Sequence, residues 1–173
     1  MPIYAHAKKE GGFTLVEVLL YLAISSAMLT VIVTFLFVLM QSRIKNQTIA
    51  EVEQQGLQAV QLITTTARNA EAIVVPVPGA SSTSLTLQVS DVAKDPTVFS
   101  VSEGTFFITE GASVPIAITS PLVEASDISF SNLSATGTPG SIKISFTLSR
   151  TNVDGKSEYD YSQTFYGSSN IRR

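Results

Sequence analysis

An apolar run from Phe13 to Met40 constrains this 173-residue chain more than any other feature, because Glu17 is its only charged residue. About 20 apolar residues in a helix cross the hydrocarbon core of a bilayer, so the run is long enough to span a membrane. An ionised carboxylate in such a span costs roughly 2.5 to 3.5 kcal/mol on insertion scales and is usually a paired, functional group. The run itself contains no basic partner for Glu17.

A partner for Glu17 arises if the peptide bond between Gly12 and Phe13 is cleaved. The new α-amine of Phe13 is positively charged near pH 7. On a helix, Phe13 and Glu17 of the same chain lie one turn apart along the axis. A neighbouring subunit displaced by about that distance aligns the two charges better, so the pair favours assembly.

The segment Gly12-Phe13-Thr14-Leu15-Val16-Glu17, with its apolar continuation, resembles the cleavage and methylation signature of type IV prepilins and type II secretion pseudopilins. The resemblance implies that a membrane-embedded prepilin peptidase cleaves after Gly12 and N-methylates Phe13. It also implies that Glu17 neutralises the amino terminus of a neighbouring subunit during filament assembly. Thr14 then takes the polar second position of the mature chain. The motif with its apolar tail covers about the first quarter of the chain.

Each part of this segment, taken alone, fits a simpler feature. Gly11-Gly12 is also typical of a flexible loop before a membrane span. Glu17 could snorkel towards a lipid headgroup. A secretory signal peptide likewise has a basic leader, but its apolar core has 7 to 15 residues and a small-x-small cleavage site follows it. Here residues 36–40 run directly into Gln41-Ser42-Arg43, which favours cleavage before the span.

The flanking charges bear on orientation. Lys8 and Lys9 place the leader on the cytoplasmic side by the positive-inside tendency. Arg43 and Lys45 at the far end of the run weaken that argument. We expect a single span in the cytoplasmic membrane with the C-terminal head outside the cytoplasm.

A helical pattern continues beyond the apolar run. Small or apolar residues recur every three or four positions: Ile49, Val52, Gly56, Ala59 or Val60, Ile63, Ala67 and Ala70. We predict one helix from about Phe13 to about Ile73, in which residues 13–40 form the membrane and filament-core part and residues 41–75 an amphipathic continuation. Gly56 is the weak point and could permit a bend. Two helices broken near residues 42–46 are the alternative.

Residues 76–173 predict an antiparallel β-rich head. Apolar residues alternate with polar ones over residues 84–90, 98–102, 105–109 and 142–149. Glu103-Gly104 and Asn152-Val153-Asp154-Gly155 are typical hairpin turns. The clearest hairpin pairs residues 142–149 with a return strand over residues 159–165, and shorter strands are expected at residues 114–118 and 128–133. The stripe on the helix would cover the apolar face of the sheet. The expected fold class is therefore α+β, with a long N-terminal helix packed on an antiparallel head.

The head offers no recognisable catalytic constellation. The only histidine is His6 in the leader, and the chain contains no cysteine. Asp154-Gly155 fits a hairpin turn better than a calcium loop, since the spacing of an EF-hand is absent. Tyr159, Tyr161, Phe165 and Tyr166 could form a recognition patch, although cross-strand pairing explains them more simply. We expect no enzymatic activity, cofactor or metal, and the net charge of −3 gives no footprint for nucleic acid.

Together these features predict a filament subunit, a minor pilin or minor pseudopilin with residues 1–12 as a cleaved leader, and a major subunit is the alternative within the same family. The resemblance implies three protein partners: the prepilin peptidase, other pilin or pseudopilin subunits, and an inner-membrane assembly platform. Membrane lipid surrounds the helix before assembly, and the assembled filament is extracellular or periplasmic. The alternative is a single-pass, membrane-anchored adhesin or binding module that never enters a filament.

Overall fold

The computed structural model describes residues 12–135, 140–152 and 155–172. The predicted leader, apart from Gly12, therefore lies outside the described residues, as do His6, Lys8, Lys9 and the middle of the predicted turn at residues 152–155. The chain divides into two compact units, one up to Ser42 and one from Arg43 onward.

A single helix, α1 (Leu15–Arg68), carries the apolar run and the stripe that follows it. It continues through residues 42–46, so the alternative of two helices is wrong. The predicted end near Ile73 is also wrong, because Ile73 lies in strand β1 (Ala72–Val75). The backbone N–H of Arg172 donates to the carbonyl of Arg68 at 3.1 Å, and that of Glu71 donates to Gln88 at 2.8 Å. These distant partners end the helix and draw the chain into a sheet.

The first sheet of the head contains five strands in the order β1-β3-β4-β5-β6, each pair antiparallel. Its further members are β3 (Leu85–Gln88), β4 (Thr97–Ser102), β5 (Thr105–Glu110) and β6 (Ile116–Ala117). The β4–β5 turn confirms the predicted hairpin, since Glu103 and Gly104 both have positive φ, at 49° and 74°. Two such residues form the type I′ turn that matches the twist of paired strands.

The second sheet has the order β2-β7-β8-β9 and is also antiparallel. Its strands are β2 (Ser81–Ser82), β7 (Val123–Asn132), β8 (Ser141–Arg150) and β9 (Ser162–Asn170). The hairpin between β8 and β9 confirms the strongest strand prediction. Tyr159 departs from it, because it ends a 3₁₀ helix (Ser157–Tyr159) and the return strand begins only at Ser162. Neither β1 nor β2 was predicted.

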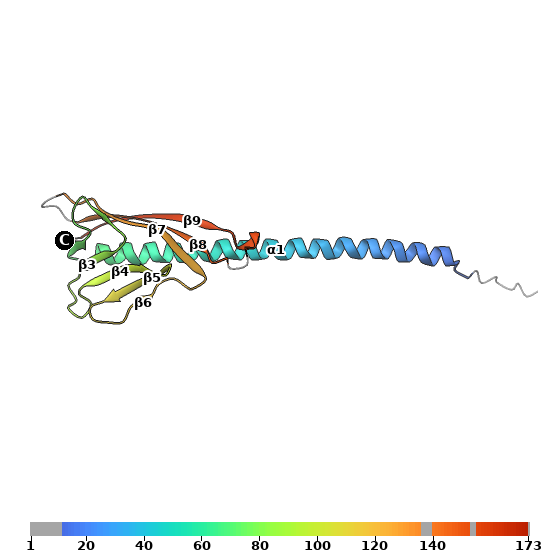
Figure 1. The fold of residues 1–173 in the computed structure, drawn as a ribbon, viewed down its shortest axis with the longest axis horizontal. Coiled ribbons are helices and arrows are strands. Elements are labelled where there is room, and N and C mark those ends of the chain that lie inside the picture. Colours follow the sequence, from blue (N-terminus) through green and yellow to red (C-terminus); the bar gives the residue numbers. More distant parts are fainter. Residues whose placement is uncertain (1–11, 136–139, 153–154, 173) are drawn as a thin grey trace, which may run out of the picture. The chain divides into compact units, whose positions relative to one another are not determined.

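The two sheets and the C-terminal part of α1 share one hydrophobic core (Figure 1). The helix contributes its predicted stripe, with Val52, Ala59 and Ile63 fully buried. Both sheets contribute fully buried phenylalanines: Phe99, Phe106, Phe130 and Phe146. Burying one such side chain stabilises the fold by about 1.5 to 3 kcal/mol. The α+β architecture is thus confirmed, with the helix as the element that both sheets cover.

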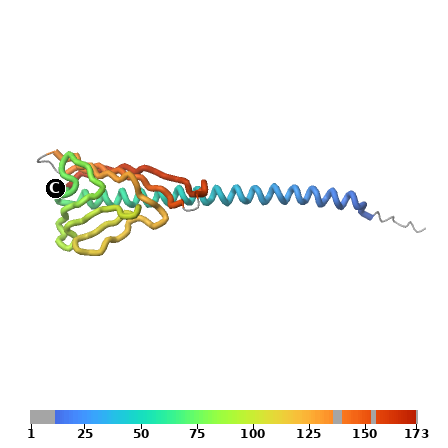
Figure 2. Tube along the Cα trace, in the orientation of Figure 1, coloured from blue at the N-terminus to red at the C-terminus, as the bar shows by residue number. Residues whose placement is uncertain are grey.

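The C-terminal strand lies along α1, and the end of the described chain lies beside the end of that helix (Figure 2). Ser169 donates its hydroxyl to the carbonyl of Thr64 at 2.8 Å. A Cβ on Gly167 would meet Val60 at 2.9 Å, so the strand approaches the helix more closely than a larger residue would allow. Strand β9 therefore holds the last turns of α1 in the head.

Candidate functional site

The predicted site residues at the start of the chain gather around the first turn of α1. Gly12, Phe13 and Thr14 precede the helix, and Glu17 lies in its first turn. The hydroxyl of Thr14 accepts a hydrogen bond from the backbone N–H of Glu17 at 3.3 Å. The Thr14 carbonyl accepts the N–H of Val18 at 3.2 Å, which begins the helical ladder. Thr14 is therefore the N-cap of α1.

The carboxylate of Glu17 has no ion-pair partner within the described part of the chain. The two ion pairs found there, Lys94–Glu110 and Arg150–Glu51, belong to the head. Glu17 lies in the first turn of α1, where the backbone N–H groups of the helix carry a partial positive charge. This partial charge does not replace an ion-pair partner.

The side chains of α1 between Leu15 and Met40 are exposed over the whole circumference of the helix. The helix is long and apolar enough to cross a membrane. A helix that is apolar all round needs an apolar environment, which either lipid or other helices can supply. Residues 13–40 thus form a surface that is suited to burial and that this single chain does not itself bury.

Two threonines interrupt the apolar surface without leaving polar groups unsatisfied. Thr30 donates its hydroxyl to the Ser26 carbonyl, and Thr34 donates to the Thr30 carbonyl, each at 2.9 Å. Such bonds to the preceding turn remove the cost of an unpaired hydroxyl in hydrocarbon. These two threonines are therefore compatible with a membrane span.

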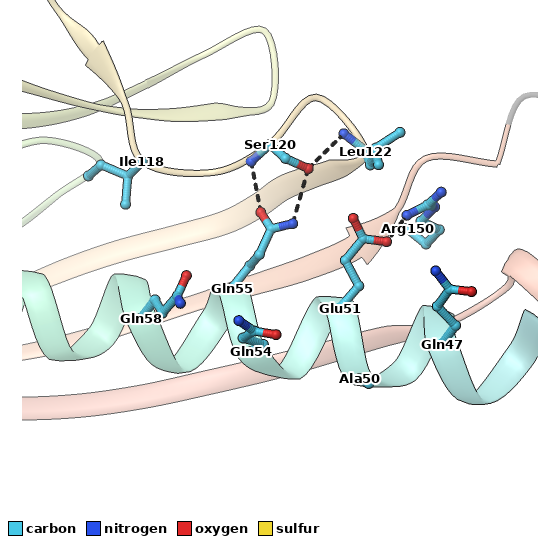
Figure 3. Close-up of a pocket in the computed structure, with 10 residues that line it drawn as sticks. All are labelled: Gln47, Ala50, Glu51, Gln54, Gln55, Gln58, Ile118, Ser120, Leu122 and Arg150. Atoms are coloured by element: carbon cyan, nitrogen blue, oxygen red, sulfur yellow. Dashed lines mark hydrogen bonds and ion pairs between the residues drawn. The ribbon is translucent and has the colours of Figure 1, made fainter.

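A groove lies in the head, between α1 and the segment that leads into β7 (Figure 3). We call it the glutamine groove. Its volume is about 620 Å³, and it is lined by Gln47, Ala50, Glu51, Gln54, Gln55, Gln58, Ile118, Ser120, Leu122 and Arg150. Most of its polar side chains are amides, which do not perform acid–base chemistry. Within the described residues, no group of three or more histidine, cysteine, aspartate or glutamate side chains could hold a metal ion.

The contacts within the glutamine groove join the parts of the head to the helix. The Gln55 side chain accepts the Ser120 backbone N–H at 2.7 Å and donates to the Ser120 hydroxyl at 3.0 Å (Figure 3). Arg150 at the end of β8 forms an ion pair with Glu51. The Arg150 guanidinium also lies 5.7 Å from the centre of the Tyr159 ring. Four of the polar residues that line the groove, Glu51, Gln55, Ser120 and Arg150, therefore have a structural role.

Tyr161 adds one more contact between the β8–β9 hairpin and α1. Its hydroxyl donates to the Glu53 carboxylate at 3.3 Å. Partial desolvation and the negative charge of Glu53 raise the pKa of the Tyr161 hydroxyl above its ordinary value of 10.0. The aromatic residues do not form one recognition patch: Phe165 is buried, and Tyr166 is 69% exposed.

The raised pKa of Tyr161 predicts a loss of head stability in alkali. A group whose pKa is higher in the folded state contributes stability that is complete below the unfolded pKa and is lost as pH rises through the folded pKa. Between about pH 9 and pH 11, the urea midpoint of the wild-type head should fall more than that of Tyr161→Phe. The measurement is far-UV circular dichroism of the full chain in detergent. Equal decreases of the urea midpoint in both proteins would show that Tyr161 does not contribute to the pH dependence of head stability.

The sequence pointed to Thr14 and Glu17 at the start of α1, but the hydrogen bond that links them was not predicted. The pattern Thr14-x-x-Glu17 matches a capping box, a signal that was available in the sequence. The glutamine groove was not predicted, because its two sides come from residues 47–58 and 118–122. No local pattern in either segment indicates the other.

Comparison with known proteins gives one match. The family model described as the prokaryotic N-terminal methylation motif matches residues 7–33. This range contains Gly12, Phe13, Thr14 and Glu17 together with most of the apolar run. A search of curated proteins and a search of solved structures found no match to the chain.

Proposed function

Because residues 7–33 carry the methylation motif that is the signature of type IV pilins and pseudopilins, we propose that this chain is a minor subunit of a type IV pilus or of a type II secretion filament. The observation that carries the proposal is this motif, joined to an α1 whose first half is apolar all round and exposed. The motif by itself supports a pilin-like or pseudopilin subunit.

The signature implies two kinds of partner, a prepilin peptidase and other pilin subunits. The apolar helix fits membrane anchoring with a C-terminal head. In our proposal the peptidase removes residues 1–12 by cleavage between Gly12 and Phe13 and then methylates the Phe13 amine. An inner-membrane assembly platform then moves the processed subunit from lipid into the filament.

Glu17 sets the register of assembly in this proposal. Cleavage creates the Phe13 amine, which carries a positive charge near pH 7. The Phe13 amine of one subunit pairs with the Glu17 carboxylate of its neighbour, because a shift of about one helical turn brings the two groups together. Either charge alone in an apolar core costs several kcal/mol, whereas the pair satisfies both. Thr14 supports this pairing, because its hydroxyl accepts the backbone N–H of Glu17 within the same chain and so does not bind the neighbouring subunit.

The apolar part of α1 has two successive roles. Before assembly, residues 13–40 contact lipid, and after assembly the same surface contacts neighbouring helices. Both environments are apolar, so the transfer exposes little hydrocarbon surface to water and needs no chemical change in the helix. The head remains outside the cytoplasm in both states.

The assignment as a minor subunit rests on three features. The head contains no cysteine pair, such as often closes the C-terminal loop of major pilins. The processed chain begins with phenylalanine. The head is rich in strands, which form two antiparallel sheets.

The test of the proposed function is the mass of the amino terminus in cells that contain an active prepilin peptidase. We expect a product that begins with N-methylated Phe13 and that copurifies with other pilin subunits. An intact Met1 on a chain that remains alone in the membrane would contradict the proposal and would favour an anchored binding module.

Substitution of Gly12 should separate effects on the peptidase from effects on the fold. A Cβ on Gly12 meets no atom within 4 Å, so changes there do not disturb this chain. We expect partial processing of Gly12→Ala and none of Gly12→Phe, because bulk at this position obstructs the cleavage pocket. The gel mobility of the product measures the extent of processing of each variant. Val18→Phe, which adds the same ring to the exposed helix surface, is the matched control and should be processed normally.

A further inference from the structure

The bond proposed for cleavage, between Gly12 and Phe13, lies two residues before the first helical residue, Leu15. Thr14-Leu15-Val16-Glu17 matches the capping-box pattern, and the hydroxyl of Thr14 accepts the N–H of Glu17. An N-cap residue has a backbone conformation outside the helical region. Thr14 thus separates helical residues from the preceding segment, and Gly12 and Phe13 are not helical.

A second contact acts on the same segment. The Phe13 ring lies against the Tyr21 ring edge to face, with 6.4 Å between centroids and 71° between planes. This ring contact links the Phe13 side chain, which is otherwise largely exposed, to α1, while the Phe13 backbone lies outside the helix.

The conformation of this segment matters for hydrolysis because of one particular hydrogen bond. If α1 began one turn earlier, the N–H of Val16 would bind the carbonyl of Gly12, which is the carbonyl of the bond to be cleaved. In apolar surroundings a backbone N–H without a hydrogen-bond acceptor costs several kcal/mol, which favours this bond. A peptidase would then have to break that bond before its own groups could reach the carbonyl. The cap at Thr14 prevents this extension.

We infer that Thr14 is a positioning residue for processing: its hydroxyl caps α1 and keeps the Gly12–Phe13 bond outside the helix, accessible to the peptidase. This inference rests on the proposed function, since it concerns the cleavage assigned there. It gives Thr14 a role in the precursor, before any contact with another subunit. The hydroxyl acts through the helix start and does not touch the reacting atoms.

The experiment compares processing rates of full-length variants in cells with the peptidase. Thr14→Val keeps the shape of the side chain but removes the acceptor, and Thr14→Ala removes both. Thr14→Ser and Thr14→Asn keep a cap-forming oxygen. We expect conversion to slow by about fivefold for the valine and alanine variants, which corresponds to the loss of a typical cap. The serine and asparagine variants should remain near the wild-type rate.

Pulse labelling followed by gel mobility gives the rate, and mass spectrometry confirms the cleaved bond. Thr34→Val is the matched control, because it removes a hydroxyl that donates only to the Thr30 carbonyl within the same helix. It should be processed like the wild type. Membrane extraction at alkaline pH shows that every variant is inserted.

Each result has a distinct meaning. Equal or faster processing of Thr14→Val would overturn the inference while the proposed function stands. Slow processing of Thr14→Asn beside normal processing of Thr14→Ser would also overturn it, because the enzyme would then be recognising the hydroxyl itself. A wild-type chain that remains uncleaved beside an active peptidase would contradict the proposed function, and this inference with it.

Discussion

A Glu17→Leu chain is expected to reach the membrane as well as the wild type and to be nearly absent from filaments. Insertion does not need the carboxylate, since leucine at this position makes the span more apolar. Assembly does need it in our proposal, because the Phe13 amine of the neighbouring subunit would enter an apolar core unpaired. Removing one member of a buried pair typically costs about 3 to 5 kcal/mol. Such a cost lowers incorporation by roughly a hundredfold or more, at about 1.4 kcal/mol per factor of ten.

The measurement is the ratio of this subunit in sheared filaments to that in the membrane fraction, by immunoblot. Glu17→Gln removes the charge but keeps the shape of the side chain, and its incorporation into filaments should be almost as low as that of Glu17→Leu. Glu71→Leu removes an exposed carboxylate of the head and is the matched control, which should leave incorporation unchanged. If Glu17→Leu reached filaments in wild-type amounts, the charge pair would have no role in assembly.

Gly56→Ala is expected to destabilise the head, although helix propensity alone predicts a gain of about 1 kcal/mol. Gly56 is buried on α1, and an added Cβ would overlap the ring of Phe165 on β9. That ring cannot easily retreat, since it stacks on Phe146 at 5.6 Å, and Phe146 packs edge to face on Phe106 at 4.9 Å. Overpacking of this kind costs about 1 to 3 kcal/mol, and a separated ring stack adds to that cost. Packing should therefore outweigh propensity.

Urea denaturation of the full chain in detergent, followed by the far-UV circular dichroism of the head, measures this change. Leu57→Ala is the matched control on the neighbouring, 63% exposed position and should shift the midpoint little. The double variant Gly56→Ala with Phe165→Leu should be more stable than the sum of the single effects predicts, because the smaller side chain admits the methyl group. A higher midpoint for Gly56→Ala alone would show that Phe165 yields and that Gly56 is not a packing requirement.

The start of α1 and the hairpins could be predicted because their signals are local. Thr14 and Glu17 are three residues apart, so the cap and the first-turn carboxylate are encoded within one turn. Glu103-Gly104 alone specifies a tight turn between flanking strands. The stripe from Val52 to Ala67 has the period of a helix and identifies its buried face without knowledge of what covers it.

Only the tertiary structure decided where α1 ends, because the N–H group that binds the Arg68 carbonyl belongs to Arg172. The same holds for Gly56: the sequence indicates a weak helix position, and the fold shows a site for the Phe165 ring. The glutamine groove likewise depends on Gln55 meeting Ser120, 65 residues away. Patterns of a few residues specify caps, turns and periodicity, because those interactions lie within the pattern. Contacts between distant segments depend on the packing of the whole core, which no short pattern contains.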